Sequence, residues 1–396
     1  MDKLWTKNFV LIMVINLITF FGFQMLTPTL PLYVEKLGGT QADAGLVIGI
    51  FALSAVLIRP VVGQGLDRYG RKGLFITGLG IFLISTLAYN WVPTVLFLLV
   101  LRFLQGFGWG ALNTAAGTIA SDVIPRKRLA EGMGYFGIAG DIAMAVGPAL
   151  GLFLTGSRGF SSLFFSAAFA VLLAMVLAFL ISHRRDNAAG SEVNNNADNA
   201  VRPSYFEKSA VRPSVVMFFV TMTFGAIVSF LALYAAQLGI SNAGLFFTLY
   251  ALALMTSRPL FGRLADKRDN TMIIITGVLL IFAALIILAQ ANAAGHPYEM
   301  LLLAGIVYGF GFGAVQPSLQ AMVVRDLPFN RRGAANAIFF SSFDMGVGLG
   351  SVLWGMIAEV SGYNVMYFAA SISALCALGC FLLFGRQRKN ERFIEE

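Results

Sequence analysis

Residues 59–72 read RPVVGQGLDRYGRK, and residues 258–271 read RPLFGRLADKRDNT. The two stretches share an arginine, a proline, a glycine and an aspartate at matching places, with an offset of 199 residues. A second pair, GFGWGA at 106–111 and GFGFGA at 309–314, is offset by 203 residues. Matches of this length at nearly constant offsets indicate that the chain consists of two related halves.

The composition indicates a membrane protein. Hydrophobic residues make up 58% of the 396 residues and charged residues 12%, about half of the ~25% that is typical of soluble domains. Too few polar side chains are available to cover the surface of a soluble protein of this size. A soluble enzyme, a nucleic-acid-binding domain and a disordered protein are therefore excluded.

Twelve apolar segments are each long enough to cross a bilayer, which takes about 20 residues of helix. They are predicted at 8–34, 44–64, 73–91, 94–118, 130–155, 160–182, 214–238, 243–264, 271–291, 299–324, 333–358 and 364–385. The predicted fold class is an all-α membrane protein with twelve transmembrane helices in two pseudo-symmetric six-helix bundles. Repeats related by an axis along the membrane normal are typical of secondary transporters, whose substrate site lies between the repeats.

The most polar stretch of the chain, residues 183–213, separates the two halves. It is rich in asparagine, alanine and charge, and it is predicted to be a flexible cytoplasmic linker. The predicted domains are an N-terminal bundle (1–182), this linker, a C-terminal bundle (214–385) and a cytoplasmic tail (386–396).

Lysine and arginine are distributed unequally between the two sides of the membrane. Of the 28 residues of these types, Lys36 and Arg158 fall in loops opposite the termini, and Arg59, Arg102 and Arg258 fall inside spans. All others lie on the side of the termini. Because short basic loops stay in the cytoplasm, both termini are predicted to be cytoplasmic, in the cell membrane of a bacterium.

Four motifs resemble those of the major facilitator superfamily. Residues 63–72 resemble the family's motif between spans 2 and 3, residues 262–270 its degenerate copy between spans 8 and 9, and residues 102–110 its span-4 motif. The fourth motif, which the family associates with antiporters, comprises Gly147, Pro148 and Gly151. The resemblance implies a transporter similar to the family's drug:proton antiporters.

The resemblance assigns the first of these motifs to a gate on the cytoplasmic side. Asp67 would face the positive N-terminal end of the eleventh span, where a carboxylate is favourable, and Gly63 would let another helix approach closely. In the second copy, Asp266 would face the N-terminal end of the fifth span in the same way. This second gate contact is expected to be weaker. The predicted gate residues are Gly63, Asp67, Arg68, Gly70, Arg71, Lys72, Gly262, Asp266 and Lys267. Alternatively, they are only topology signals.

Two arginines precede the gate aspartates by about two helical turns. Arg59 and Arg258 lie inside the second and eighth spans. Their long side chains either extend to the cytoplasmic headgroups or contact the opposite half.

Three charged residues deep in the spans are candidates for proton coupling, because charge within a membrane is costly and usually functional. Asp141 and Arg102 lie roughly 15 Å and 12 Å into adjacent antiparallel spans, and they are predicted to pair. Gly305 stands at the position that matches Arg102 in the second half. Asp344 is therefore predicted to lack a cationic partner and to carry the proton. Alternatively, it only accepts hydrogen bonds from neighbouring serines.

Polar and aromatic residues recur at helical spacing along several spans, which places them on one face of each helix. By resemblance, spans 1, 4, 7 and 10 line a central cavity, where aromatic rings with few amides suit an amphipathic organic molecule. The predicted cavity residues are Asn16, Thr19, Phe20, Phe23, Gln24, Gln105, Trp109, Asn113, Thr221, Phe224, Tyr308, Phe312, Gln316 and Gln320. For each of them, the alternative is a bond between helices.

The sequence thus predicts a secondary active transporter that exports an amphipathic small molecule against protons by alternating access. The family's drug:proton antiporters often carry an acid in span 1, but none lies between Met13 and Val34, so coupling is expected elsewhere. The alternatives are a proton symporter or facilitator for a small nutrient and, outside transport, a lipid flippase or intramembrane enzyme.

The sequence contains no motif for a catalytic or metal site. It has no nucleophile–base pair and no phosphate-binding loop, and no histidine lies near Cys376 and Cys380. No enzymatic activity, metal or cofactor is therefore predicted. The expected partners are a small-molecule substrate, protons and the lipid bilayer, without nucleic acid, and a monomer is expected.

Overall fold

The computed structural model describes residues 4–125, 128–181, 208–265, 270–293, 295–324 and 332–395, whose regular elements are all helices. The first half contains α1 (Lys7–Leu26), α2 (Leu30–Lys36), α3 (Gln41–Tyr69), α4 (Arg71–Ala88), the 3₁₀ helix η1 (Tyr89–Trp91), α5 (Val95–Val123), α6 (Leu129–Arg158) and α7 (Phe160–Phe179). The second half contains α8 (Lys208–Gln237), α9 (Gly244–Ala265), α10 (Asn270–Gln290), α11 (Pro297–Val324) and α12 (Arg332–Glu395).

Ten stretches of described residues are long and apolar enough to cross a membrane. The last of them, 335–383, holds two predicted spans, because Gly362 adopts a φ of 77° and interrupts the helix there. The predicted span at 243–264 is α9, which is apolar over Gly244–Ser257. Every predicted span therefore corresponds to a helix, and the predicted fold class is confirmed.

Several predicted boundaries differ from the structure by a few residues, and three of these differences change how the chain is divided. The first span is not one helix, because α1 ends at Leu26 and α2 begins at Leu30. Pro28 lies in this break, where it has no backbone N–H to continue the helix. Helix α8 begins at Lys208, inside the predicted linker, and α12 continues through the predicted tail to Glu395.

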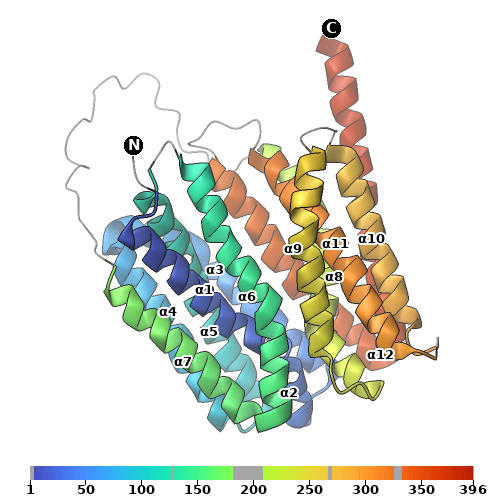
Figure 1. Ribbon diagram of the computed structural model, residues 1–396, viewed down its shortest axis with the longest axis horizontal. Coiled ribbons are helices and arrows are strands. Elements are labelled where there is room, and N and C mark those ends of the chain that lie inside the picture. Colours follow the sequence, from blue (N-terminus) through green and yellow to red (C-terminus); the bar gives the residue numbers. More distant parts are fainter. Residues whose placement is uncertain are drawn as a thin grey trace.

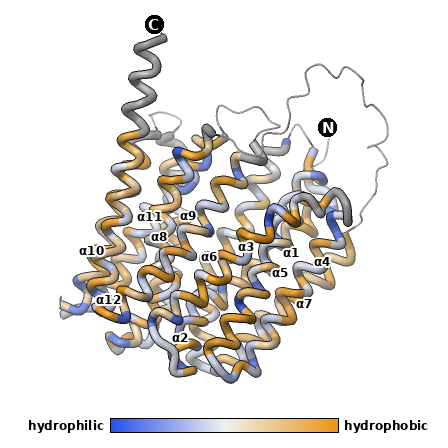
Figure 2. The backbone as a smooth tube through the Cα atoms, turned by 180° about the vertical axis from the view of Figure 1, so that it is seen from behind, coloured by the Kyte–Doolittle hydropathy of each residue, from blue (hydrophilic) through white to orange (hydrophobic). Residues whose placement is uncertain are grey.

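The two halves stand side by side, blue to green beside yellow to red, and the long helices run across the molecule (Figure 1). We call the end where α1 begins the terminal end and the end where α2 lies the distal end. Figure 2 shows hydrophobic residues along most of each helix and hydrophilic ones mainly near the helix ends, as expected for helices in a bilayer.

The sequence repeat is also a repeat of helix packing. A Cβ on Gly78 of α4 would lie 2.6 Å from the backbone nitrogen of Leu112 on α5. At the matching place, a Cβ on Gly277 of α10 would lie 2.6 Å from Val315 on α11. Both helix pairs therefore come close because a glycine lies at the contact.

A buried tyrosine hydrogen bond repeats as well. The hydroxyl of Tyr33 donates to the backbone oxygen of Tyr89 at 3.3 Å. The hydroxyl of Tyr234 donates to that of Leu288 at 3.2 Å. The offsets of 201 and 199 residues match those of the sequence repeat, so the second half reproduces this hydrogen bond as well as the helix packing.

Candidate functional site

The two halves meet along α3 and α12, and small residues line this contact, which we call the α3–α12 seam. A Cβ on Gly45 of α3 would collide with the backbone oxygen of Ser351 on α12. A Cβ on Gly348 would lie 2.7 Å from Ala52, and one on Gly355 would lie 2.6 Å from the backbone oxygen of Gln41. These contacts bring the distal part of α3 against the part of α12 that approaches the distal end.

A second contact between the halves, between α6 and α9, also lies toward the distal end. A Cβ on Gly244, the first residue of α9, would lie 3.5 Å from Ala149 of α6. Toward the terminal end, a Cβ on Gly63 of α3 or on Gly137 of α6 would meet nothing within 4 Å. Among the residues that the structure describes, none approaches Gly63 closely, whereas small residues pack the halves together near the distal end.

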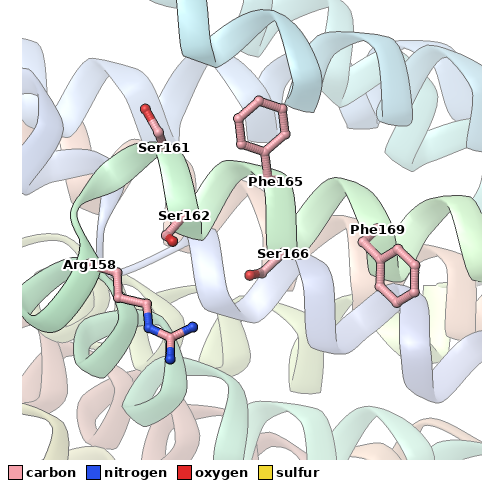
Figure 3. A pocket seen from close by; sticks show the side chains of 6 residues that line it. All are labelled: Arg158, Ser161, Ser162, Phe165, Ser166 and Phe169. Carbon is pink, nitrogen blue, oxygen red and sulfur yellow. The ribbon is translucent and has the colours of Figure 1, made fainter.

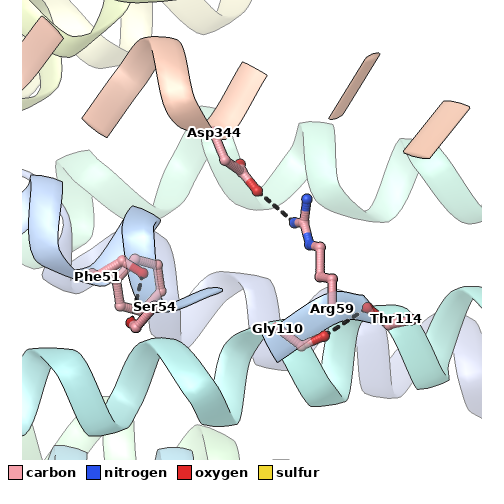
Figure 4. Close-up of polar contacts among 6 residues, drawn as sticks. All are labelled: Phe51, Ser54, Arg59, Gly110, Thr114 and Asp344. Atoms are coloured by element: carbon pink, nitrogen blue, oxygen red, sulfur yellow. Dashed lines mark hydrogen bonds and ion pairs between the residues drawn. The ribbon is translucent and has the colours of Figure 1, made fainter. Parts of the chain in front are cut away.

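An ion pair crosses the interface at the inner end of the α3–α12 seam. Nη2 of Arg59 on α3 lies 2.5 Å from Oδ2 of Asp344 on α12 (Figure 4). Asp344 is about 18 Å along the axis of α12 from its start at Arg332, at 1.5 Å per residue. Figure 4 places Arg59 beside Gly110 and Thr114, in the middle of α5. We call Arg59 and Asp344 the inter-half ion pair.

This pair corrects the prediction that Asp344 lacks a cationic partner. The prediction was based on Gly305, which stands in the second half at the position of Arg102. The actual partner, Arg59, comes from α3 across the interface. It also decides between the two alternatives for Arg59, whose guanidinium turns to the opposite half. The side chains of Arg59 and Asp344 remain 18% and 25% exposed, so protein encloses neither completely.

Arg102 lies in a buried polar network inside the first half. It is 1% exposed, and its Nε donates to the backbone oxygen of Val47 at 3.0 Å. Its Nη1 donates to Oε1 of Gln105 at 2.7 Å, and its guanidinium lies 4.0 Å from the ring centre of Phe51. The cation is thus balanced by two oxygens and an aromatic ring. The side chain of Asp141, its predicted partner, lies outside the described part of the structure.

The network extends from Gln105 to α4 and η1. The hydroxyl of Tyr89 donates to Oε1 of Gln105 at 2.5 Å. The amide nitrogen of Gln105 donates to the hydroxyl of Thr86 at 2.8 Å. Gln105 is fully buried, so it connects three helical elements and is not available to a substrate in this conformation.

The predicted gate is described only in part. The side chains of Asp67 and Arg68 lie outside the described part of the structure, as do Asp266 and Lys267 entirely. Gly70 ends α3 with a φ of 86°, a left-handed conformation that glycine adopts without strain. Gly262 lies within α9. The role of these residues as a gate stays a prediction.

Two of the predicted gate cations make contacts within the first half. Arg71 at the start of α4 forms an ion pair with Asp122 near the end of α5. Nζ of Lys72 donates to the backbone oxygens of Phe179 and Ile181 at 2.8 Å each, at the end of α7. In this conformation they tie α4 to α5 and α7. Asp122 was missed, although it lies near the terminal end of α5, beside the start of α4.

Aromatic rings form a cluster in the first half, where the cavity was predicted. Phe23 of α1 stacks on Trp109 of α5 and on Phe51 of α3, with centroid distances of 4.1 and 5.2 Å. Phe20, one turn before Phe23, lies 4.8 Å from the same tryptophan. The cation of Arg102 lies on the ring of Phe51. The aromatic cluster and the buried network are therefore one continuous structure.

A matching cluster lies in the second half. Phe224 of α8 stacks on Phe312 of α11 at 5.2 Å and lies 6.1 Å from Tyr250 of α9. These three residues correspond in the repeat to the phenylalanine, tryptophan and phenylalanine of the first cluster. Tyr308 is fully buried, and its hydroxyl lies 2.9 Å from that of Thr223.

Burial divides the predicted cavity residues into two groups. Those with less than a tenth of their surface exposed are Asn16, Thr19, Gln105, Trp109, Thr221, Phe224, Tyr308 and Phe312. The hydroxyls of Thr19 and Thr221 donate to backbone oxygens one turn earlier in their own helices. In this conformation the side chains of this group are enclosed by protein, and their role as a cavity lining stays a prediction. The partly exposed group is Phe20, Phe23, Gln24, Asn113, Gln316 and Gln320.

The glycines of the predicted antiporter motif pack α6 against α1. A Cβ on Gly147 would lie 2.7 Å from the side chain of Gln24, and one on Gly151 would collide with the backbone of Met25. Pro148 lies between them inside the helix. The motif therefore holds two helices of the same half together.

A shallow hollow of about 500 Å³ lies over the start of α7 (Figure 3). It is lined by Arg158, Ser161, Ser162, Phe165, Ser166 and Phe169. None of these residues belongs to the inter-half ion pair or the aromatic clusters, so we do not assign the hollow to transport.

Comparison with known proteins agrees with this architecture. The sequence profile of the Major Facilitator Superfamily matches residues 12–290 and 213–396. The chain belongs to this superfamily. It is 28% identical over 386 residues to an MFS-type transporter of Methanocaldococcus jannaschii, a match that covers 96% of this chain and 99% of the relative.

A second relative is named for drug export. The chain is 27% identical over 383 residues to the multi-drug resistance efflux pump PmrA of Streptococcus pneumoniae, covering 93% of each chain. Among solved structures, the nucleoside transporter NupG matches with a TM-score of 0.74 at 14% identity, covering 96% of this chain and 99% of that one. The superfamily member described here is thus a multi-pass membrane transporter, and several of its relatives are multidrug efflux pumps.

Proposed function

We propose that this transporter exports an amphipathic small organic molecule in exchange for protons by alternating access. The observation that carries the proposal is the inter-half ion pair, two opposite charges deep within the spans that belong to different halves. Charges at such depth are costly, and they are usually functional. The similarity to multidrug efflux pumps supports the direction of transport and the class of substrate.

The coupling step follows from the charge of Asp344. When ionised, its carboxylate attracts the guanidinium of Arg59 across the interface. A proton bound by Asp344 removes that attraction, so the free energy of the contact between the halves depends on proton occupancy. A ligand that changes the balance between two conformations in this way is coupled to the transition. Asp344 is therefore the proposed proton carrier. Its cationic partner is Arg59, although the sequence predicted that it has no such partner.

Alternating access requires that one end of the interface opens while the other closes. The small-residue contacts of this conformation lie near the distal end. If the basic loops are cytoplasmic, the distal end faces outward and the protein is closed on the outer side in this conformation. The rocking units would be the bundles 1–182 and 214–385, with the first turn of α8 extending into the segment that joins them. The partly exposed phenylalanines and amides would meet the substrate between them.

The test uses purified protein in liposomes that contain a pH-sensitive dye. A pH gradient is imposed, and cationic, neutral and anionic amphiphiles are added in turn. We expect substrate-triggered proton flux, and we expect Asp344→Asn to reduce it at least about tenfold, because an amide cannot carry the proton. The matched control is Glu299→Gln, which removes a carboxylate in the exposed first turn of α11, outside the seam.

Two outcomes would overturn parts of the proposal. If Asp344→Asn gave the proton flux of the unmodified protein at the same amount of reconstituted protein, Asp344 would not be the proton carrier. Movement of labelled substrate without proton flux in the unmodified protein would indicate a facilitator or a sodium-linked carrier instead.

A further inference from the structure

The distal end of the α3–α12 seam holds a carboxylate that no motif predicted. The backbone N–H of Ala42, in the first turn of α3, donates to Oε2 of Glu359 on α12 at 3.0 Å. The two residues belong to different halves of the molecule. This hydrogen bond joins the halves at the opposite end of the seam from the inter-half ion pair.

The N-terminus of α3 is otherwise capped by its own residues. Thr40 accepts a hydrogen bond from the backbone N–H of Asp43 at 3.2 Å, and Asp43 accepts one from the backbone N–H of Thr40 at 2.9 Å. Such a capping box leaves other N–H groups of the first turn without a partner in their own helix. Glu359 supplies an acceptor for one of these N–H groups from the second half. Its negative charge is favourable beside the positive end of the helix dipole.

Glu359 continues the stripe of α12 residues that forms the seam. Asp344, Gly348, Ser351, Gly355 and Glu359 follow one another at spacings of three or four residues, which is one face of a helix. A carboxylate therefore stands at each end of the stripe, separated by about 22 Å at 1.5 Å per residue. Both meet an electropositive group of α3, a guanidinium at the inner end and a helix N-terminus at the distal end.

The contact between α6 and α9 has no such carboxylate. At the repeat offset of 203 residues, Gly156 stands where α12 carries Glu359. A Cβ on Gly156 would meet nothing within 4 Å. The charged contact at the distal end therefore belongs to the α3–α12 seam, and α6 has no carboxylate at the matching position.

We propose that Glu359 is a gating residue, which holds the distal end closed until the halves rock apart. In transport, its hydrogen bond to α3 must break each time that end opens. The proposal rests on the alternating access proposed above, but it does not depend on which ion is coupled. Losing the carboxylate should shift the resting population toward the conformation with an open distal end.

The test measures that population directly. In full-length protein with Cys376 and Cys380 replaced by serine, spin labels are placed on cysteines at Trp91 and Asn292, which are exposed near the distal end on opposite halves. Pulsed dipolar spectroscopy in lipid nanodiscs then gives the distribution of distances between the labels. For Glu359→Ala we expect about a threefold rise in the ratio of long to short distances. A change of this size corresponds to the stabilisation that one exposed charge gives at a helix end.

Two further variants separate gating from helix capping. Glu359→Gln keeps an acceptor oxygen but loses the charge, so a smaller rise is expected. Asp43→Asn weakens the capping box of the same helix terminus inside the first half, and it should leave the ratio unchanged.

Other outcomes would overturn the proposal. An unchanged ratio in Glu359→Ala, or an equal rise in Asp43→Asn, would show that Glu359 does not control the distal end. A rise in Glu359→Ala without proton flux in the unmodified protein would support the gate while rejecting proton coupling.

Discussion

Arg102 on α5 and Gly305 on α11 occupy matching positions in the two halves, but their surroundings differ. Around Arg102, the first half buries a cation together with Gln105. Around Gly305, the second half leaves little room for a side chain, because a Cβ there would lie 3.0 Å from the backbone oxygen of Phe246. The two halves thus share the close contacts of the backbone but differ in their polar interior.

The largest expected effect comes from removing the cation that only the first half contains. Arg102→Met should destabilise the protein by about 3 kcal/mol, because it removes the buried cation that donates to Oε1 of Gln105 and to the backbone oxygen of Val47. Thermal unfolding in detergent measures the loss. Arg158→Met, at an exposed arginine, serves as the control. Melting of both variants at the unmodified temperature would mean that the network adds no stability.

The next largest loss of stability comes from disturbing the repeated glycine packing. Because the packing is the same in both halves, the loss should be equal in both. Gly78→Val and Gly277→Val each place a side chain where even a Cβ is too close to the neighbouring helix. Each should cost about 2 kcal/mol, measured by the same thermal unfolding. Gly80→Val is the control, since a Cβ on Gly80 meets nothing within 4 Å. A clear difference between the first two variants would show that the packing is less symmetric than the contacts suggest.

The repeated tyrosine hydrogen bond should give a smaller, paired effect. Tyr33→Phe and Tyr234→Phe each remove one donor to a backbone oxygen. The expected loss is about 1 kcal/mol in each case. If one variant were as stable as the unmodified protein, the two bonds would not be equivalent despite their matching positions.

The smallest effect concerns the ion pair between Arg71 and Asp122, whose side chains are 33% and 36% exposed. In the repeat, these positions are Asn270 and Arg325, so the second half has no matching opposite charges. Arg71→Gln should lower stability by less than about 1 kcal/mol, because exposed pairs are weakened by water and salt. The difference from the unmodified protein should shrink further at high salt, and a loss that does not respond to salt would contradict this reading.

The spans could be predicted from the sequence because length and hydrophobicity act locally. Every apolar segment became a helix. The errors lie at breaks and ends, such as the division of the first span near Pro28 and the early start of α8 at Lys208. Local chemistry favours several end points of similar free energy there, and contacts with other helices select one of them.

The candidate site was predicted less well, because burial and pairing depend on distant residues. Asp344 was identified as an intramembrane charge, but its partner Arg59 lies in the other half of the chain. Gln105 and Tyr308 have the helical spacing of cavity residues, yet each is fully buried and bonded to neighbouring helices. Glu359 gave no signal at all, since its partner is a backbone N–H.

The sequence by itself determined the membrane environment, the helices, the two-fold repeat and the superfamily, because composition, hydrophobic length and motif spacing are properties of the chain alone. Only the tertiary structure decided which charges meet, which predicted cavity residues are enclosed and at which end the small-residue contacts between the halves lie. The physical reason is that each half folds around its own contacts. The interface between the halves instead depends on helices that are far apart in the chain, α3 with α12 and α6 with α9.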